Sequence, residues 1–405
     1  VHPENPGAPV TRKPPPTASV LAPRATARRL SADLRRRSVL GGLAAAGSAW
    51  ALAACGGGSS SSSSSAATAD GQVEDALNIY TWADYDAPEV LEAFQADGGP
   101  TLQIDSYGSN EEMLAKLVAA KGASGYDIVV PTGLFIPQMG ANGFLTELDR
   151  SKLPNFANLD PQYLGQTWDP DNTYSVPKDW GTTGFIYDTT VIGRELTSWA
   201  DFLDAAQKEA SGSVSVLEDP WEVTCIWFAA NGIDPNTSDP AQLQACEDYL
   251  VANLAPRLKG FESNPGGSAI AQSTYALMQC WNGDARLGLD GSDEPDKWKY
   301  VFPTPTANLW MDNWCITAGA EHPDAAYAFI DHVLDVDVSI QELLYIGYNT
   351  GLKDIEAKAT AAGLDRAELV FPAPEIVARL TASVLNDGHE TIVAILGKIR
   401  AAAGA

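Results

Sequence analysis

The sequence predicts an α/β fold arranged as two lobes. Its 405 residues exceed the usual range of a single domain and can bury two hydrophobic cores. From Leu77 onward, short apolar runs alternate with helical patterns, as they do in βα units. The run YDIVVPT at 126–132 is apolar along most of its length, which is typical of a strand buried in a parallel sheet. Ligands of such sheets bind outside the carboxyl ends of the strands, so we expect the site there.

Residues 1–55 predict an export signal rather than a folded element. Three arginines at 35–37 precede an apolar stretch that is too short and too rich in Gly and Ala to span a membrane. RRSVL resembles a twin-arginine signal and LAAC resembles a lipoprotein lipobox, which makes Cys55 the expected lipidated residue. A flexible Gly/Ser linker is expected at 56–76. A single-span anchor or an unprocessed tail is the alternative.

The charge of the chain excludes several classes of partner. There are 26 basic and 52 acidic residues, a formal net charge of −26. Residues 1–55 hold eight of the basic and two of the acidic residues, so 56–405 carry 18 basic and 50 acidic residues, a net charge of −32. Such a body repels nucleic acid and attracts cations. We therefore expect no nucleic-acid partner.

The first elements of the folded part are two strands, each followed by a helix. LNIYTW at 77–82 and LQIDSYG at 102–108 predict the strands. Ser109, three residues before Glu112, predicts a capping box that opens the second helix. One face of this helix should carry the apolar residues Met113, Leu114, Leu117 and Val118.

The later elements continue the alternation. A turn-rich run at 169–188 leads into a strand, and SWADFLDAAQKEA predicts a helix. SVSVL predicts another strand, which a loop with Asp219 and Glu222 joins to a helix. We also expect strands in ARLGLD (285–290) and in 299–316, and a helix after His322-Pro323.

Four short stretches place aromatic residues beside carboxylates. They are TWADY at 81–85, LEDPWEV at 217–223, CWNGDA at 280–285 and LWMDNW at 309–314. Each alone fits a core or interface Trp, and Asp219 before Pro220 fits a helix cap. Together, without Lys or Arg between them, they would form a mutually repelling acidic cluster. A bound cation would relieve that repulsion.

An alkyl-ammonium ligand accounts for both residue types. Carboxylates accept charge-assisted hydrogen bonds from ammonium groups, and aromatic rings cover methylenes and add cation–π attraction. Carboxylates separated by rings would fix the number and the spacing of the charges. The pattern therefore predicts a polyamine site.

An enzyme is the second interpretation. Paired carboxylates with aromatic rings also serve glycosidases. The sequence contains no G-x-S-x-G, no H-E-x-x-H and no Gly-rich phosphate loop, and neither cofactor nor metal is expected. Four cysteines remain after Cys55, and their spacing fits no zinc site. They allow three disulfide pairings, Cys225 with Cys246 among them, or buried thiols: Cys225, Cys246, Cys280 and Cys315.

From Leu77 to the C-terminus the sequence resembles the bacterial extracytoplasmic spermidine/putrescine-binding proteins of ABC transporters. The resemblance is carried, in order, by IYTWADY, YGSNEEMLAKL, YDIVVPT, LDRSKLPNFANLDP, DPDNTYSVPKDWGTTG, TSWADF, EDPWEV, WNGDA, WMD and IGY. It implies a two-lobed periplasmic-binding-protein fold in which crossover strands join the lobes and one ligand lies in the cleft. Lobe 1 would comprise 77–184 and 312–356, and lobe 2 would comprise 185–311 and 357–405.

The resemblance also implies the ligand-binding residues. Asp312, with Asp84 or Asp284, would bind ammonium groups, and Glu222 with Asp219 would bind a second or middle amine. Ala83, Gly133 and Leu134 depart from the family pattern, which leaves open which polyamine binds. Trp314 is expected in the core beneath the site. The full expected set is Trp82, Asp84, Tyr85, Thr132, Asp219, Glu222, Trp281, Asp284, Trp310, Asp312 and Tyr348.

We therefore expect a solute-binding lipoprotein of an ABC transporter, not an enzyme. It would be a monomer, anchored through Cys55 to the outer face of the cytoplasmic membrane, that delivers a putrescine- or spermidine-class amine to the permease. A receptor of the same fold for another small solute, or a secreted carboxylate glycosidase, is the alternative. The sequence leaves open the affinity, the cysteine pairing, the translation start and the permease.

Overall fold

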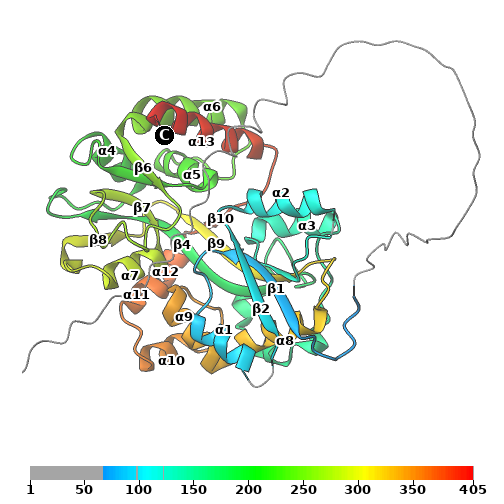
Figure 1. Cartoon of the computed structure of the whole chain (residues 1–405). Coiled ribbons are helices and arrows are strands. Elements are labelled where there is room, and N and C mark those ends of the chain that lie inside the picture. Colours follow the sequence, from blue (N-terminus) through cyan, green and yellow to red (C-terminus); the bar gives the residue numbers. More distant parts are fainter. Residues whose placement is uncertain (1–66, 97–98, 122, 405) are drawn as a thin grey trace, which may run out of the picture. The chain divides into compact units, whose positions relative to one another are not determined.

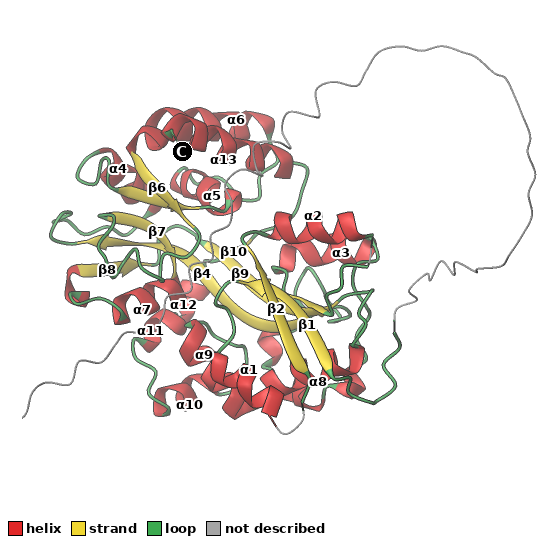
Figure 2. Cartoon of the chain, in the orientation of Figure 1, coloured by secondary structure: helices red, strands yellow, loops and turns green. Residues whose placement is uncertain are grey.

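The computed structural model describes residues 67–96, 99–121 and 123–404. The predicted signal, Cys55 and residues 56–66 of the predicted linker lie outside this part. In the described chain, strands join in the order β2-β1-β3-β9-β4-β7-β5-β6, with β10 beside β9 and β8 beside β4 (Figure 2). The strands are β1 (Ala76–Trp82), β2 (Thr101–Tyr107), β3 (Ile128–Val129), β4 (Val176–Asp188), β5 (Val214–Leu217), β6 (Leu258–Glu262), β7 (Leu277–Trp281), β8 (Trp298–Val301), β9 (Asn308–Ile316) and β10 (Thr381–Ala382).

The helices form groups on either side of the β4–β9 pair. α1, α8 and α9 pack together near β1, whereas α5, α6 and α13 pack together beside β5 and β6 (Figure 1). No helix within the described ranges has the length and hydropathy needed to cross a membrane. The helices are α1 (Pro88–Gln95), α2 (Asn110–Ala120), α3 (Ile136–Ala141), α4 (Trp199–Gln207), α5 (Pro220–Ala230), α6 (Pro240–Tyr249), α7 (Asn282–Asp290), α8 (Pro323–Val333), α9 (Val336–Ile346), α10 (Ile355–Ala361), α11 (Ala367–Val370), α12 (Pro374–Val377) and α13 (His389–Ala403).

Strand direction divides the sheet into two parallel parts joined by antiparallel strands. β1 runs parallel to β2 and β3, and β5 runs parallel to β6 and β7. β4 and β9 pair antiparallel with each other, and each also pairs with one of these parts. All 13 residues of β4 are buried because the strand passes through the middle of this arrangement. The lobe boundaries expected at 184/185 and 311/312 fall inside β4 and β9, and the assignment of segments to lobes stays a prediction.

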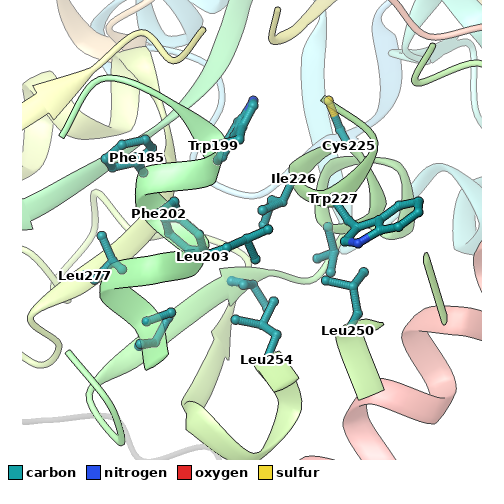
Figure 3. Close-up of a cluster of buried hydrophobic side chains, with 14 of the residues drawn as sticks. Phe185, Trp199, Phe202, Leu203, Cys225, Ile226, Trp227, Leu250, Leu254 and Leu277 are labelled. Carbon is teal, nitrogen blue, oxygen red and sulfur yellow. The ribbon is translucent and has the colours of Figure 1, made fainter. Parts of the chain in front are cut away.

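Buried apolar side chains gather separately around the two parts, as the chain length predicts. Around β1 and β3, the core includes Trp314 of β9 and Phe329 of α8. Around β5 and β7, the core is built from α4, α5 and α13, and Trp199 and Phe202 lie against Phe185 of β4 (Figure 3). The described chain therefore has the two-lobed α/β architecture that the sequence predicts.

The opening of α2 differs in detail from the predicted capping box. The Ser109 hydroxyl accepts the Glu112 N–H at 3.2 Å, but the Glu112 carboxylate accepts the Gly108 N–H at 2.9 Å rather than that of Ser109. Of the predicted apolar face, Met113 and Leu117 are buried and Val118 is exposed. The helix covers the sheet with a narrower stripe than we expected.

The strand predicted at 285–290 is wrong. ARLGLD lies in α7, where Ala285 and Leu289 are buried at helical spacing against Ile270 and Met278. A short apolar run fits either period, so the sequence pattern could not separate strand from helix. The predicted strand at 126–132 is also shorter than expected, because β3 covers two residues.

The four cysteines of the described chain are buried free thiols. The pairing of Cys225 with Cys246 that the sequence allowed is not formed. Burial raises the pKa of all four thiols, so they remain protonated at neutral pH.

Candidate ligand-binding site

The candidate site lies on one face of the antiparallel β4–β9 pair. Asp179 is opposite Asp312, and Gly181 is opposite Trp310. Successive side chains of a strand point to opposite faces, so these four residues share one face. A Cβ atom at Gly181 would lie 2.4 Å from Cζ2 of Trp310, so only glycine leaves room for the indole there. The arrangement places the Trp310 ring beside two carboxylates.

Asp312 is held by the hydroxyl groups of two other residues. Its Oδ1 accepts a hydrogen bond from Thr132 Oγ1 at 2.6 Å, and its Oδ2 lies 3.0 Å from Tyr85 Oη. Asn110 at the start of α2 orients Thr132, since its Nδ2 donates to Thr132 Oγ1 and its Oδ1 accepts the Thr132 N–H. Burial raises the pKa of Asp312 to about 6, although the bonds from Thr132 and Tyr85 oppose this shift.

A buried cation lies behind Asp312, and sequence reasoning missed it. Lys178 Nζ is 3.0 Å from Asp86 Oδ1 and 3.9 Å from both Asp179 Oδ2 and Glu342 Oε2. It also lies over the rings of Tyr85, at 4.6 Å, and Trp314, at 4.5 Å. Among the predicted acids, Asp312 therefore has a cation nearby, and the charge of Lys178 lowers the pKa of Asp312 and offsets part of the effect of burial. We call Asp312, Asp179, Tyr85, Thr132 and Lys178 the Asp312 end of the site.

A β-bulge gives Lys178 its direction. Pro177 is opposite Asn313 and Asp179 is opposite Asp312, so Lys178 is the extra residue between two paired positions. Bulges re-aim side chains and are frequent beside functional sites. Here the bulge lets Asp179 face the site while Lys178 reaches Asp86 and Glu342. Trp314, two residues beyond Asp312, lies in the core beneath the site, as predicted.

Asp284 and Tyr348 form a second acidic position beside Trp310. The Tyr348 hydroxyl donates to Asp284 Oδ2, and Asp284 Oδ1 accepts the Gly266 N–H at 3.0 Å. The Tyr348 ring meets the Trp310 ring edge-on at 4.8 Å and lies 6.4 Å from the Tyr85 ring. Burial raises the pKa of Asp284, and these hydrogen bonds partly offset it. An aromatic wall thus separates Asp284 from the Asp312 end.

A third acidic position lies at the start of α5. Glu222 Oε1 accepts hydrogen bonds from Thr183 Oγ1 at 2.7 Å and from Asn308 Nδ2 at 2.8 Å. Its Oε2 is buried and has no hydrogen-bond partner of good geometry among the described residues. Asp219 caps α5 by accepting the Glu222 N–H at 3.0 Å. We call Glu222, Asp219, Thr183 and Asn308 the Glu222 end.

Both acids of the Glu222 end favour the protonated form more than free carboxyls do. Burial raises the pKa of Glu222, and donors on Asn308, Thr183 and Trp281 lower it only in part. Burial and the neighbouring charges of Glu222 and Glu111 raise the pKa of Asp219 to about 8. The cap role that the sequence allowed for Asp219 is therefore present, in a position that is also electrostatically unfavourable for a carboxylate.

The remaining predicted residues are less closely involved. Trp82 is half-buried, and its Nε1 donates to the Val130 carbonyl at 3.2 Å. Trp281 is half-buried at the end of β7, opposite Thr183. Asp84 is exposed on a turn with φ of 54°, apart from the contacts described above.

A small cavity beside Trp310 is lined in part by Trp168, a residue that the sequence analysis did not single out. The cavity has a volume of about 10 Å³, and Thr132, Trp168 and Trp310 are among its lining residues. A Cβ atom at Gly133 would lie 2.3 Å from the Trp168 ring, so Gly133 makes room for that ring. The departure from the family pattern at Gly133 was the signal that could have indicated a ring from elsewhere in the chain.

The site therefore combines buried carboxylates, hydroxyl groups and aromatic rings. Within the described ranges, no group of three or more His, Cys, Asp or Glu side chains is arranged to hold a metal ion. The side chains contact one another and leave little space, so an organic cation would have to separate them on entry. The chemistry of the site is that of non-covalent recognition of positive charge.

Comparison with known proteins identifies the family. Residues 89–365 match the family described as bacterial extracellular solute-binding protein. The chain belongs to this family. The spermidine/putrescine-binding periplasmic protein 1 of Haemophilus influenzae is 33% identical over 313 residues, which cover 77% of this chain and 84% of that protein. The spermidine/putrescine-binding periplasmic protein of Escherichia coli is 33% identical over 285 residues, or 70% of this chain and 80% of that protein.

Solved structures agree with this family assignment. The spermidine/putrescine ABC transporter substrate-binding protein PotD from Streptococcus pneumoniae has a TM-score of 0.67 and 28% identity, and the match covers 82% of this chain and all of that one. A putative spermidine/putrescine ABC transporter protein from Listeria monocytogenes has a TM-score of 0.72 and 26% identity, with 81% and 99% covered. The predicted fold class and family resemblance are confirmed.

Proposed function

We propose that this solute-binding protein captures a polyamine of the putrescine or spermidine class between its lobes and delivers it to an ABC transporter permease. The observation that carries the proposal is the alternation of buried carboxylates and aromatic rings on the β4–β9 face. Ammonium groups can bind at the carboxylates, while Trp310 and Tyr348 cover the methylenes between them. The names of the relatives support the same class of ligand.

Each acidic position has a distinct proposed role. Asp312 receives one terminal ammonium group, because it shares the strand face with Trp310 and lies beside the hydroxyl groups of Thr132 and Tyr85. Asp284 and Glu222 are the candidates for the next amine, and the free Oε2 of Glu222 is the better acceptor. Trp82 and Trp281 add half-buried aromatic surface. We also propose the lipid anchor at Cys55, the monomeric state and the extracytoplasmic location of the anchored protein.

A ligand panel tests the proposal. Thermal unfolding should be followed with putrescine, cadaverine, spermidine, spermine, amino acids and oligosaccharides, and positive results should be repeated by calorimetry. A ligand that binds only the folded state raises the unfolding temperature as its concentration rises. We expect a shift with at least one polyamine. A shift with a sugar or an amino acid, and with none of the amines, would overturn the proposal.

A further inference from the structure

Tyr85 lies between two buried carboxyl groups and has too few protons for both. Its Oη is 2.5 Å from Asp179 Oδ1 and 3.0 Å from Asp312 Oδ2. A phenol has one proton and can donate to only one of these oxygens. The other contact would then join two oxygens with no hydrogen between them. A second proton is needed in this cluster.

The neighbouring hydroxyl cannot supply that proton. Thr132 Oγ1 already accepts from Asn110 Nδ2 and donates its only proton to Asp312 Oδ1. The contact between Asp312 Oδ2 and Tyr85 Oη therefore receives no proton from Thr132. Asp179 Oδ2 lies 3.9 Å from Lys178 Nζ and has no hydrogen-bond partner among the described residues.

Positive charge around the pair is limited. Lys178 is the cation next to Asp179, and it is shared with Asp86 and Glu342. The other titratable groups facing the pair are the phenols of Tyr107 and Tyr348. Burial raises the pKa of Tyr85, of Asp179 and of Asp312, so Tyr85 keeps its proton and a carboxyl group is the more favourable second holder.

We propose that Asp179 and Asp312 together hold one proton across Tyr85 in the empty receptor, and that an ammonium group binding at Asp312 displaces this proton to solvent. The inference rests on the proposed function. The ligand remains protonated, an N–H···O bond replaces the carboxylic O–H, and water or buffer accepts the released proton. Asp179 acts through Tyr85 and is a positioning residue.

Proton release makes binding depend on pH. Where the empty pair holds its proton, each binding event releases about one proton, and Kd falls about tenfold for each pH unit of increase. At higher pH, where the empty pair has lost the proton, Kd no longer changes with pH. The receptor would therefore bind its ligand more weakly in acid, although the amine itself is fully charged there.

Calorimetry in buffers of different ionisation enthalpy tests the proposal. We expect the purified protein to release about one proton on binding putrescine or spermidine on the acid side of the Asp312 pKa of about 6. Asp179→Asn copies a protonated carboxyl and supplies the missing hydrogen to Tyr85. This variant should bind the amine, release about one proton fewer than the wild type and show a correspondingly weaker dependence on pH.

Glu342→Gln is the matched control. Burial raises the pKa of Glu342 to about 7, and this residue faces Lys178 without contacting Tyr85. Its replacement should leave proton release unchanged. Wild-type binding without proton release, equal release by Asp179→Asn, or loss of release in Glu342→Gln alone would each overturn the inference.

A measurement without ligand separates this inference from the proposed function. In infrared difference spectra between the wild type and Asp179→Asn, the wild type should show one additional protonated carboxyl band that is lost on titration to alkaline pH, whereas the bands of Asp219, Glu222 and Glu342 are common to both proteins. If no amine binds, the proposed function fails, but the band still tests the shared proton. If amines bind and the wild-type protein lacks the band, the inference alone fails.

Discussion

The two ends of the candidate site stabilise buried acids in different ways. At the Asp312 end, an internal cation, Lys178, lies 3.9 Å from Asp179, and hydroxyl groups of Tyr85 and Thr132 contact Asp312. At the Glu222 end the donors to Glu222 are neutral, and Oε2 has no hydrogen-bond partner of good geometry within the described chain. The Asp312 end therefore contains a positive charge of its own. The Glu222 end instead offers a hydrogen-bond acceptor, Glu222 Oε2, without a cation beside it.

This difference separates the stability of the fold from recognition of the ligand. A buried carboxylate needs a cation, a proton or several donors. Lys178 serves this need at the Asp312 end before any ligand arrives, and it also ties β4 to α9 through Glu342. The Glu222 end is incompletely satisfied without ligand. We therefore expect substitutions at Lys178 to act mainly on folding, and substitutions of Asp312 and Glu222 to act mainly on ligand binding.

Replacing Lys178 should have the largest effect. Lys178→Met leaves Asp86, Asp179 and Glu342 buried without their shared cation, and breaking such a pair costs about 3–5 kcal/mol of unfolding free energy. Chemical denaturation measures the loss. Lys299→Met is the matched control, since its pair with Glu195 is exposed and contributes about 0–1 kcal/mol. Equal losses in the two variants would contradict the role of Lys178.

The Lys178→Met loss should depend on pH in a defined direction. Burial raises the folded-state pKa of Glu342 to about 7, above its value in the unfolded chain. A carboxyl group of this kind stabilises the fold in its protonated form, and that contribution is lost as pH rises through about 7. Without the charge of Lys178, the pKa values of Asp86, Asp179 and Glu342 should rise further. The destabilisation should therefore be greater above a pH of about 7 than in mild acid.

Asp312→Asn should have the next largest effect, and it should act on binding. Removing one member of a desolvated charge pair costs about 2–5 kcal/mol of binding free energy. The substituted amide keeps an acceptor for Thr132, so the unfolding temperature should change little. Calorimetry with the best polyamine measures the affinity, and exposed Asp293→Asn is the control. An affinity close to that of the wild type would remove Asp312 from the ligand site.

Much of the Asp312 end could be predicted from local sequence patterns, but the position of Lys178 could not. Trp310, Asp312 and Trp314 alternate along one strand, and the family resemblance, which matches Trp310 and Asp312 but not Trp314, implied their division into site and core. Lys178 stood in a run that the sequence presented as rich in turns, and the bulge that directs it leaves no local pattern. Its partners Asp86 and Glu342 are distant in sequence, so only the topology of β4, α1 and α9 brings the three together.

The sequence identified the acidic residues of the Glu222 end, but it could not predict their hydrogen-bond partners. Asp219 and Glu222 stood out because LEDPWEV places carboxylates beside an aromatic residue. The sequence put both in a loop before a helix, whereas Asp219 is the N-cap of α5 and Glu222 lies in its first turn. Thr183 and Asn308 carried no signal, because each is an ordinary strand residue until β4 and β9 meet α5. Long-range pairing decides which oxygen of Glu222 is occupied and which is left free.

Glu222→Gln should have a smaller effect than Asp312→Asn. The new side chain can keep the acceptor used by Thr183 and Asn308, but it replaces the free Oε2 by an amide nitrogen that cannot accept from an ammonium group. A hydrogen bond to a charged group contributes about 1.5–3 kcal/mol, which is the affinity loss we expect. Calorimetry should show it, while the unfolding temperature should not fall, because a buried charge is removed. A large loss of stability would indicate that Glu222 is structural.

Asp84→Asn should have the smallest effect, and it tests how far the family pattern transfers to this chain. The resemblance made Asp84 and Asp284 equal candidates for an ammonium group, but the structure exposes Asp84 and buries Asp284 against Tyr348. Asn tolerates the positive φ of 54° at this turn, so stability should hold. Surface substitutions of this kind change free energies by about 0.5 kcal/mol or less, and we expect a change in binding no larger than that. A tenfold loss of affinity would show that the turn carrying Asp84 moves onto the ligand, and the acids of the site would then extend beyond the β4–β9 face.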